Sequence, residues 1–423
     1  MEVEAKDRTY RPSLAAVRKA SERISPVSRV TPLTRSETYS SLYGSNVLFK
    51  REDLQQVRSY KIRGAFNKIS ALSPEQLRGG VVCASAGNHA QGVAFACNTL
   101  KTKAVIYMPV TTPRQKVEQT RMFGGKWTEV VLHGDSFDES YKEAVLHGQL
   151  HNLIFIHPFD DEEIIEGQAT IALEILEQAQ EPIDYLFAPL GGGGLLAGVS
   201  SVFKQLSPRT KIIGVEPEGA PSMTAALRKG KVVTLDHIEK FIDGASVQRV
   251  GSRNFQLCKA NLDRMITVPE GKVCQTMLDL YNQEAIIAEP AGALALSGLD
   301  EFKDELRNQN VACIISGGNN DITRTAEIQE RALLYRGLKH YFIIRFPQRA
   351  GALKEFVAQV LGPDDDIVHF EYSKKHHREN GPAVVGIELR EQTDFDPLVK
   401  RMKDRNFFGQ YLNNSPDLFQ YLV

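Results

Sequence analysis

The sequence has little of what marks a secreted, membrane-bound or nucleic-acid-binding protein. Its 423 residues carry 51 basic and 52 acidic side chains, a formal net charge of -1, which suggests neither a nucleic-acid partner nor an anionic membrane surface. The five cysteines are too few and too irregularly spaced for a disulfide framework or a zinc ligand set: Cys83, Cys97, Cys258, Cys274 and Cys313. We therefore expect no metal site and a reducing cytoplasm.

Targeting and membrane signals are also missing. The first residues, "MEVEAKDRTYRPS", are charged and lack the apolar region of a secretory signal. The uncharged run Tyr185–Phe203 approaches a membrane span of about 20 residues, but Pro189 and four consecutive glycines argue against a helix there. With 42% hydrophobic and 24% charged residues and no internal repeat, the chain is expected to be a soluble globular protein of two or three domains.

Short apolar runs alternate with helical patterns along the first three quarters of the chain. Helical segments such as "NHAQGVAFACNTL" and "GQATIALEILEQAQ" separate runs rich in Val, Ile and Leu, and this alternation predicts a parallel α/β sheet. The expected strands are "NVLFKRE", "GVVCASAG", "KAVIYMP", "TEVVLHG", "LIFIHPF", "DYLFAPL", "KIIGVEP" and "VACIISGG". Ligands bind such sheets at the carboxyl ends of the strands, so the strand-to-helix turns are the informative loops.

The pattern changes after Gly337. "KHYFIIRFP" predicts a strand, and "IVHFEYS", the polar turn "KKHHRENGP" and "AVVGIEL" predict a hairpin. "DFDPLVKRMKDR" predicts a helix with Asp394 as N-cap and Pro397 near its first turn, and a last strand is expected in "FGQYLNN" or "DLFQYLV". A further helix in "RAGALKEFVAQVL" is predicted from its apolar spacing: Leu353, Phe356, Val357, Val360 and Leu361. In the hairpin, Val368, Phe370 and Tyr372 alternate on one face. This order is typical of a separate ferredoxin-like α+β domain.

The loop "PLGGGGLLAG" is a candidate anion site. Its glycines let the backbone approach a ligand closely, and the helix that follows offers free N–H groups, so a phosphate is the natural ligand. A flexible linker is the alternative, although linkers rarely join a buried strand directly to an apolar helix. The loop has no Lys-Ser/Thr pair after the glycines, so it is not a nucleotide P-loop.

Three further stretches could carry chemistry. "SAGNHAQG" places Ser85 and Asn88 at an expected helix start, where they suit a carboxylate or a ring oxygen, or simply cap the helix; His89 is more typical of a structural residue. "SGGNND" puts Ser316 at a strand end, although such a turn is common. Lys61 in "SYKIRGA" would equally suit a surface helix. Together, a phosphate cradle, a lysine, an asparagine and a serine are the groups needed to hold pyridoxal phosphate.

These residues stand in the order found in fold type II (tryptophan-synthase-β-like) pyridoxal-phosphate enzymes, and the chain resembles most the biosynthetic threonine deaminases (threonine ammonia-lyases). The resemblance extends through "KREDLQQVRSYKIRGA", "ASAGNHAQGVA", "TTPRQKV", "HPFDD", "GGGGLLAG", "VEPEGAPSM", "DGASV", "AEPAGA" and "SGGNNDI" to "FPQRAGALKEF". It implies two open twisted α/β subdomains and a C-terminal ferredoxin-like (ACT-like) domain. The expected boundaries are 1–330 for the catalytic domain, with a small subdomain at about 58–160, then a linker at 331–338, the ACT-like domain at 339–413 and a tail at 414–423.

The resemblance also implies a role for individual residues. Lys61 would bind the cofactor aldehyde and act as catalytic base, Asn88 would contact the ring hydroxyl, and Ser316 would face the pyridine nitrogen. The phosphate would be enclosed by Gly191, Gly192, Gly193, Gly194 and Leu195, and the substrate carboxylate by Ser85, Ala86, Gly87, Asn88 and His89. The proton for the leaving hydroxyl would come from the cofactor phosphate or from the returned lysine. One departure is Ala169, where the family commonly has glycine.

The implied reaction is the conversion of L-threonine, and of L-serine, to a 2-oxo acid and ammonia at the first step of isoleucine biosynthesis. Isoleucine or valine would act through the ACT-like domain, and the family implies a homotetramer. A catabolic serine/threonine deaminase, a sulfhydrylase or a serine racemase is the alternative within the fold, and a catalytically silent amino-acid sensor is the alternative outside enzymes. Glu216 in "VEPEGAPSM" would hold a cation as in related racemases, or belong to a structural loop.

Overall fold

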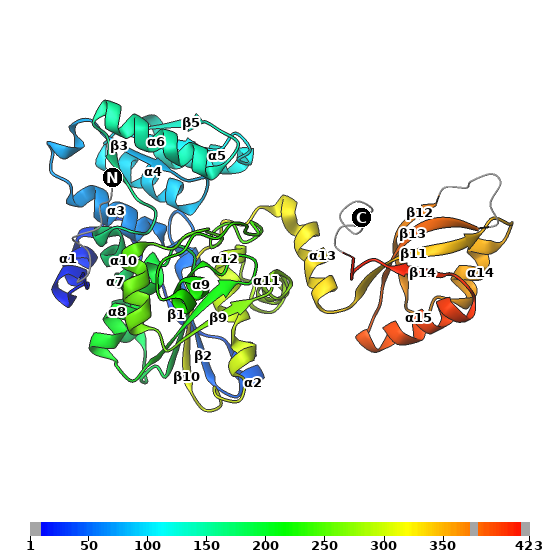
Figure 1. Cartoon of the computed structure of the whole chain (residues 1–423). Helices are drawn as coiled ribbons and strands as arrows, with labels where there is room; N and C mark the ends of the chain where they lie inside the picture. The colour runs from blue at the N-terminus through cyan, green and yellow to red at the C-terminus, as the bar shows by residue number, and fades with distance from the viewer. Residues whose placement is uncertain (1–9, 373–379, 416–423) are drawn as a thin grey trace. The chain divides into compact units, whose positions relative to one another are not determined.

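The computed structural model describes residues 10–372 and 380–415 and divides into two compact units, Met1–Thr323 and Arg324–Val423. Each unit has its own sheets and its own apolar core (Figure 1). The first unit contains two mostly parallel sheets and the second contains one antiparallel sheet. The predicted combination of an α/β unit with a ferredoxin-like α+β unit is confirmed.

The larger sheet of the first unit has six strands in the order β1-β2-β10-β7-β8-β9. Only β1 runs antiparallel to its neighbour. Its strands are β1 (Leu33–Arg35), β2 (Asn46–Arg51), β7 (Tyr185–Pro189), β8 (Lys211–Pro217), β9 (Arg264–Val268) and β10 (Asn310–Ile315). The sequence patterns missed β1, which has three residues, and β9, which begins with an exposed arginine rather than an apolar run.

The smaller sheet has four parallel strands in the order β5-β4-β3-β6. They are β3 (Val81–Ala84), β4 (Ala104–Met108), β5 (Thr128–Leu132) and β6 (Ile154–Phe155), and all four were predicted. Strand β3 is buried at every position, because helices cover both of its faces. The helix α4 in particular packs its alanines and cysteine against this sheet.

Twelve α-helices of the first unit surround these sheets. They are α1 (Leu14–Ile24), α2 (Glu37–Tyr43), α3 (Lys61–Ala71), α4 (Asn88–Leu100), α5 (Arg114–Gly124), α6 (Phe137–His151), α7 (Glu162–Gln178), α8 (Gly194–Leu206), α9 (Ser222–Lys229), α10 (Ser252–Asn261), α11 (Glu270–Glu284) and α12 (Pro290–Ser297). Helices α3 and α7 pack closely where Gly64 meets Gly167: a Cβ on Gly64 would lie 2.8 Å from the Ile164 carbonyl oxygen. Gly64 therefore permits the close approach of these two helices.

The second unit begins with α13 (Thr325–Tyr335), so residues 331–335 of the expected linker are helical. Its sheet has the order β12-β13-β11-β14. The elements are β11 (Lys339–Pro347), α14 (Ala352–Gln359), β12 (Asp366–Tyr372), β13 (Asn380–Glu388), α15 (Phe395–Asp404) and β14 (Phe408–Tyr411). The last strand lies in "FGQY", whereas the alternative "DLFQYLV" and most of the expected polar turn lie outside the described residues.

Two details of the second unit differ from the sequence prediction. Of the apolar residues predicted to share one face of α14, Phe356 and Val360, which directly follows the helix, are fully buried, but Leu353 and Val357 are each 47% exposed, so the apolar stripe is only partly covered within this unit. Asp394 precedes α15 as predicted, but its carboxylate accepts a hydrogen bond from the Glu391 N–H (3.3 Å) rather than capping α15. The preceding short turn, not the helix, therefore uses this side chain.

The uncharged run Tyr185–Phe203 divides into strand β7, the glycine loop and the start of α8. Among the residues that the structure describes, no helix is long and apolar enough to cross a membrane. All five cysteines lie in the described part of the chain, are buried and form no disulfide.

Candidate active site

The predicted site residues follow the carboxyl ends of parallel strands, as this architecture requires. Ser85–His89 comes directly after β3, Gly191–Gly194 follows β7, and Ser316 follows β10. Lys61 is the first residue of α3, and the backbone ties it to this edge: the Tyr60 N–H donates to the Ser316 carbonyl oxygen (3.1 Å). The chain thus brings together residues that are up to 255 positions apart in the sequence.

Lys61 is a half-buried residue whose amine has no carboxylate partner among the described residues. Its Nζ donates to the Pro158 carbonyl oxygen (2.9 Å), and it lies 5.4 Å from the centre of the Tyr60 ring. Burial lowers the pKa of Lys61 to about 8, against an opposing effect of Glu289. At neutral pH about a tenth of the amine is then unprotonated, far more than for an ordinary lysine, and the neutral amine is the form that a nucleophile or base requires.

The glycine loop leads into α8 with its backbone N–H groups unpaired. The Gly192 carbonyl oxygen accepts from Asn254 Nδ2 (2.8 Å) and from the Gly251 N–H, so the N–H of the same peptide unit, on Gly193, points the opposite way. Gly193 has φ +92°, and the first N–H groups of α8 have no partner within the helix. The loop thus presents several donors and the positive end of a helix, which suits a phosphate.

Phe159 explains why this loop is made of glycines. A Cβ on Gly192 would lie 2.2 Å from the Phe159 ring, and one on Gly194 would lie 2.8 Å from the Phe159 carbonyl oxygen. Any larger residue would displace the loop from the cradle shape. Since the preceding residue, Pro158, accepts the Lys61 hydrogen bond, one segment holds both the lysine and the phosphate cradle in place.

The segment His157–Asp161 belongs to the stretches that carry the resemblance, but the sequence alone predicted no role for it. His157 accepts two backbone hydrogen bonds at Nδ1, from the N–H groups of Phe159 and Asp160. The Asp160 carboxylate accepts from the first two N–H groups of α10, and Asp161 caps α7. Burial lowers the pKa of His157 to about 4, so its ring is neutral. The only sequence signal was a run of polar residues after a predicted strand.

Asn88 and Ser316 meet a carboxylate that the sequence interpretation overlooked. Asn88 Nδ2 donates to Glu289 Oε1 (2.5 Å), and its Oδ1 accepts from Asn319 (2.7 Å). Ser316 donates to the Ala291 carbonyl oxygen (3.2 Å), two residues beyond Glu289. Burial, with a contribution from Asp243, raises the pKa of Glu289 to about 7. Glu289 stands among small apolar residues in "AEPAGA", and a lone acid before a helix is a weak signal.

The turn Ser85–His89 forms the start of α4, but its residues point in different directions. Ser85 Oγ accepts from the Gly87 N–H (3.2 Å), whereas the His89 ring is buried and shares a hydrogen bond with the Ile156 carbonyl oxygen (2.9 Å). Burial lowers the pKa of His89 to about 3, so the ring is neutral. The structural role expected for the His89 side chain is confirmed, which leaves only its backbone N–H for a substrate.

The residues present fit pyridoxal phosphate. Ser246 supplies one more observation in favour: its Oγ is buried without a hydrogen-bond partner in the described structure, one residue after Ala245, whose Cα would lie 2.9 Å from a Cβ on Gly191. An unpaired hydroxyl beside a loop of free N–H groups suits a phosphate oxygen. The amine of Lys61, the amide of Asn88 and the hydroxyl of Ser316 match the remaining polar groups of the cofactor.

Glu216 behaves as a structural residue here. Its carboxylate accepts hydrogen bonds from Met223 N–H (2.6 Å), Thr224 N–H (2.9 Å) and Thr224 Oγ1 (2.9 Å), which caps α9. No group of three His, Cys, Asp or Glu side chains in the described part of the chain could hold a metal ion.

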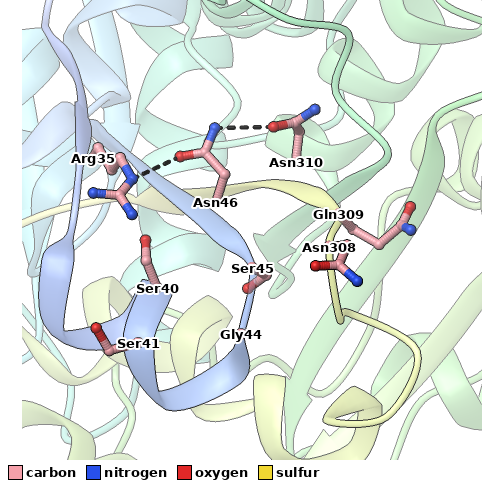
Figure 2. Close-up of a pocket in the computed structure, with 9 residues that line it drawn as sticks. All are labelled: Arg35, Ser40, Ser41, Gly44, Ser45, Asn46, Asn308, Gln309 and Asn310. Atoms are coloured by element: carbon pink, nitrogen blue, oxygen red, sulfur yellow. Dashed lines mark hydrogen bonds between the residues drawn. The ribbon is translucent and has the colours of Figure 1, made fainter.

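A separate polar pocket opens at the other end of the large sheet (Figure 2). Asn46 begins β2 and Asn310 begins β10, so this pocket lies at the amino ends of the strands. Arg35 donates to Asn46 Oδ1 (3.1 Å), and Asn46 donates to Asn310 Oδ1 (2.9 Å), as the dashed lines in Figure 2 show. These polar groups satisfy one another, so the pocket offers no reactive group.

Comparisons with known proteins agree with the site. Residues 24–317 match the family model of the pyridoxal-phosphate dependent enzymes, and residues 330–422 match that of the C-terminal regulatory domain of threonine dehydratase. The biosynthetic L-threonine dehydratase IlvA of Halalkalibacterium halodurans is 54% identical over 393 residues, covering 93% of this chain and 95% of the relative. That of Bacillus subtilis is 51% identical over 405 residues, covering 96% of each.

Solved structures show the same fold. The processed form of threonine deaminase isoform 2 from Solanum lycopersicum superposes with a TM-score of 0.71 at 40% identity, covering 77% of this chain and 96% of that one. Maize serine racemase gives a TM-score of 0.71 at 31% identity, covering 77% and 99%. This chain therefore belongs to the biosynthetic L-threonine dehydratases, enzymes of pyridoxal-phosphate fold type II that carry a C-terminal regulatory domain.

Proposed function

We propose that this enzyme converts L-threonine to 2-oxobutanoate and ammonia, at the first step of isoleucine biosynthesis, and also accepts L-serine. The observation that carries the proposal is the amine of Lys61, which has no carboxylate partner among the described residues and is held by the same segment as the glycine cradle. The relatives that are 54% and 51% identical along almost the whole chain are named for the dehydration of threonine. Both support the same chemistry.

Pyridoxal phosphate, when bound, supplies an aldehyde that links to the substrate amine and a ring that withdraws electrons from Cα. Lys61 then serves as the base that removes the Cα proton, and its lowered pKa of about 8 lets it do so near neutral pH. The N-terminal turn of α4, from Ser85 to Asn88, presents backbone donors to the substrate carboxylate. Asn88 and Ser316 would contact the cofactor ring, and Gly191–Leu195 with Ser246 would hold its phosphate.

Ser316 supports elimination rather than transamination. Its single hydroxyl proton is given to the Ala291 carbonyl oxygen here and would have to turn to donate to the ring nitrogen, so Ser316 would meet that nitrogen as a neutral hydroxyl and not as a carboxylate. A neutral partner does not keep that nitrogen protonated. The ring then withdraws electrons less strongly, so it stabilises a long-lived carbanion less well. Prompt loss of a β-hydroxyl is the reaction that suits this arrangement best.

The second unit supplies the regulation in this proposal. A small pocket at the start of α14 lies between aromatic side chains and a glycine with φ +83°, and its size and apolar lining suit a branched side chain. Its lining residues are Phe346, Pro347, Arg349, Gly351, Ala352, Leu353, Phe370 and Tyr372. Isoleucine as inhibitor or valine as activator would bind here, in a regulatory domain at 339–413 that follows a catalytic domain at 1–330. A cytoplasmic homotetramer completes the proposal.

A coupled assay for 2-oxobutanoate tests the reaction. Purified enzyme with pyridoxal phosphate is expected to form 2-oxobutanoate from L-threonine and pyruvate from L-serine. Formation of D-serine without either 2-oxo acid would instead indicate a racemase, and a colourless protein that turns over neither amino acid would indicate a sensor.

Two variants of α14 test the effector pocket. Leu353 and Val357 are equally exposed, at 47% each, but only Leu353 lines the pocket. Leu353→Ala is expected to raise the isoleucine or valine concentration for half-maximal response at least about fivefold, because it removes apolar contact area. Val357→Ala is the matched control and should leave the response unchanged. Equal shifts in both variants, or no effector response in the unaltered enzyme, would contradict this location.

A further inference from the structure

Glu289 is the one buried carboxylate of the described site for which the proposed chemistry has no use. It precedes α12 and is 6% exposed. Its own N–H donates to the Gly317 carbonyl oxygen (3.1 Å), and its Oε1 lies so close to Gly317 that a Cβ there would be 2.2 Å away. The carboxylate therefore lies directly against the loop that presents Ser316 and, through its hydrogen bond, against Asn88.

The Asn88 amide is fixed from both of its ends. Its nitrogen donates to Glu289 (2.5 Å), and its oxygen accepts from Asn319 Nδ2 (2.7 Å). Asn319 is itself held, because the same nitrogen also lies within hydrogen-bonding distance of the Val57 carbonyl oxygen (2.8 Å) and Gln91 Oε1 (3.0 Å). An ionised carboxylate is acceptor-only, so it can face the amide nitrogen of Asn88 but not the oxygen. One hydrogen of that nitrogen then remains for a ligand.

Orientation matters because an amide that rotates by half a turn exchanges donor for acceptor. If Asn88 presented its oxygen, it would repel the ring oxygen of pyridoxal phosphate instead of donating to it. Nothing else among the described contacts of Asn88 accepts a hydrogen bond from its nitrogen. Asn319, which donates to the oxygen, and Glu289, which accepts from the nitrogen, therefore select the donating orientation together, and Glu289 is the partner that holds the nitrogen.

We propose that Glu289 is a positioning residue that acts through Asn88: it holds the Asn88 amide with its N–H toward the ring oxygen of the cofactor. The inference rests on the proposed function only in taking Asn88 as the contact to that oxygen. Burial and the charge of Asp243 raise the pKa of Glu289 to about 7, whereas Lys61, Lys116 and the hydrogen bond from Asn88 favour its ionised form. A carboxyl group keeps an acceptor oxygen in either form, so Glu289 can face the Asn88 nitrogen in both.

Full-length holoenzyme variants in a double-mutant cycle test this role. Holoenzyme is dialysed against graded pyridoxal phosphate, and bound cofactor is read from its visible absorbance. Glu289→Ala is expected to weaken cofactor retention about tenfold in the otherwise unaltered enzyme, which corresponds to one hydrogen bond. In the Asn88→Ala background the same change should alter retention less than about twofold, because the group it orients is gone.

Two further variants keep the test decisive. Glu289→Gln keeps an acceptor oxygen and should restore retention to within about threefold of the unaltered enzyme. If Glu289→Ala fails to fold, Glu289→Met fills the same space and carries the same expectation. Equal losses in both backgrounds would overturn the proposal, because Glu289 would then act through the fold and not through Asn88. The formation of 2-oxobutanoate is assayed in parallel. Because cofactor retention reports the coupling between Glu289 and Asn88 without turnover, a failure of the proposed reaction is distinguished from a failure of this proposal.

Discussion

Two cations two residues apart on α3, the half-buried Lys61 and the fully buried Arg63, are chemically opposite. Arg63 forms two hydrogen bonds to Glu52, from Nε and Nη2 at 2.8 Å each, and two more to Glu174 (2.6 and 2.9 Å). Burial alone would lower the pKa of Arg63, but these carboxylates raise it above its ordinary value. Lys61 has only the Pro158 carbonyl oxygen, and its pKa falls to about 8.

The difference shows how one helical turn supplies both a structural ion-pair residue, Arg63, and a reactive amine, Lys61. A buried cation with carboxylate partners keeps its charge and fixes neighbouring segments, whereas a buried cation without them becomes a usable amine. The Arg63 cluster also includes Lys50, whose Nζ donates to Glu174 (2.5 Å) and to the Thr31 carbonyl oxygen (2.6 Å). This cluster ties α3 to β2 and α7, so the position of Lys61 depends on charges that take no part in the reaction.

Removing the reactive amine of Lys61 should have the largest effect. Lys61→Ala is expected to lower kcat for threonine at least about 10³-fold, because both the amine that holds the cofactor and the base are lost. The visible absorbance of the bound cofactor should disappear while Tm changes little. Lys61→Arg is the matched control, since it keeps a buried cation but cannot react. A yellow, active Lys61→Ala enzyme would contradict the assignment.

Removing the scaffold cation should instead affect folding. Arg63→Met leaves the fully buried Glu52 without its partner and is expected to lower the free energy of unfolding by about 3–5 kcal/mol, measured by urea denaturation. Adding Glu52→Gln should recover part of this loss by removing the uncompensated charge. Arg114→Met, at a side chain 91% exposed, is the control and should cost at most about 1 kcal/mol. Similar losses for the buried and exposed arginines would show that the cluster contributes little.

The smallest expected effect comes from Gly64, which directly follows Arg63 in α3. Gly64→Ala places a Cβ 2.4 Å from Gln168 Nε2 and 2.8 Å from the Ile164 carbonyl oxygen, so α3 must move away from α7 at a cost of about 1–3 kcal/mol. Gly92→Ala, whose Cβ would meet the Lys61 carbonyl oxygen at 3.1 Å, should cost less. Thermal unfolding ranks the two variants, and the reverse order would contradict the packing described for α3.

The sequence allowed much of this comparison to be predicted. Its alternating apolar runs predicted eight strands of the first unit, and Arg63 forms ion pairs with Glu52 and Glu174. Its partners could not be predicted, because Glu52 lies 11 positions before it and Glu174 lies 111 positions after it, and nothing in their local sequences distinguishes them from surface acids. Pairing across such distances is decided by tertiary packing.

Glu289 and α14 show two other features that could not be predicted from the sequence. Glu289 meets Asn88 across 201 positions, and its neighbours are small apolar residues that give no sign of a polar site. Around α14, helical spacing predicted one apolar face of five residues. Two of these five, Leu353 and Val357, remain exposed in the described unit. Periodicity identifies which residues share a face, but it does not say how much of that face is covered. The roles assigned to the cofactor-binding and substrate-binding residues remain predictions.

The pKa of Lys61 can be measured most directly from the rate at which cofactor-free, full-length enzyme captures pyridoxal phosphate between pH 6 and pH 11. Only the neutral amine reacts, so the rate constant should rise with pH and level off above the pKa of this lysine. Because burial without a carboxylate partner lowers that pKa, we expect a midpoint near pH 8. A rate that keeps rising to the ordinary lysine value of 10.5 would show that Lys61 is not the tuned amine of this site.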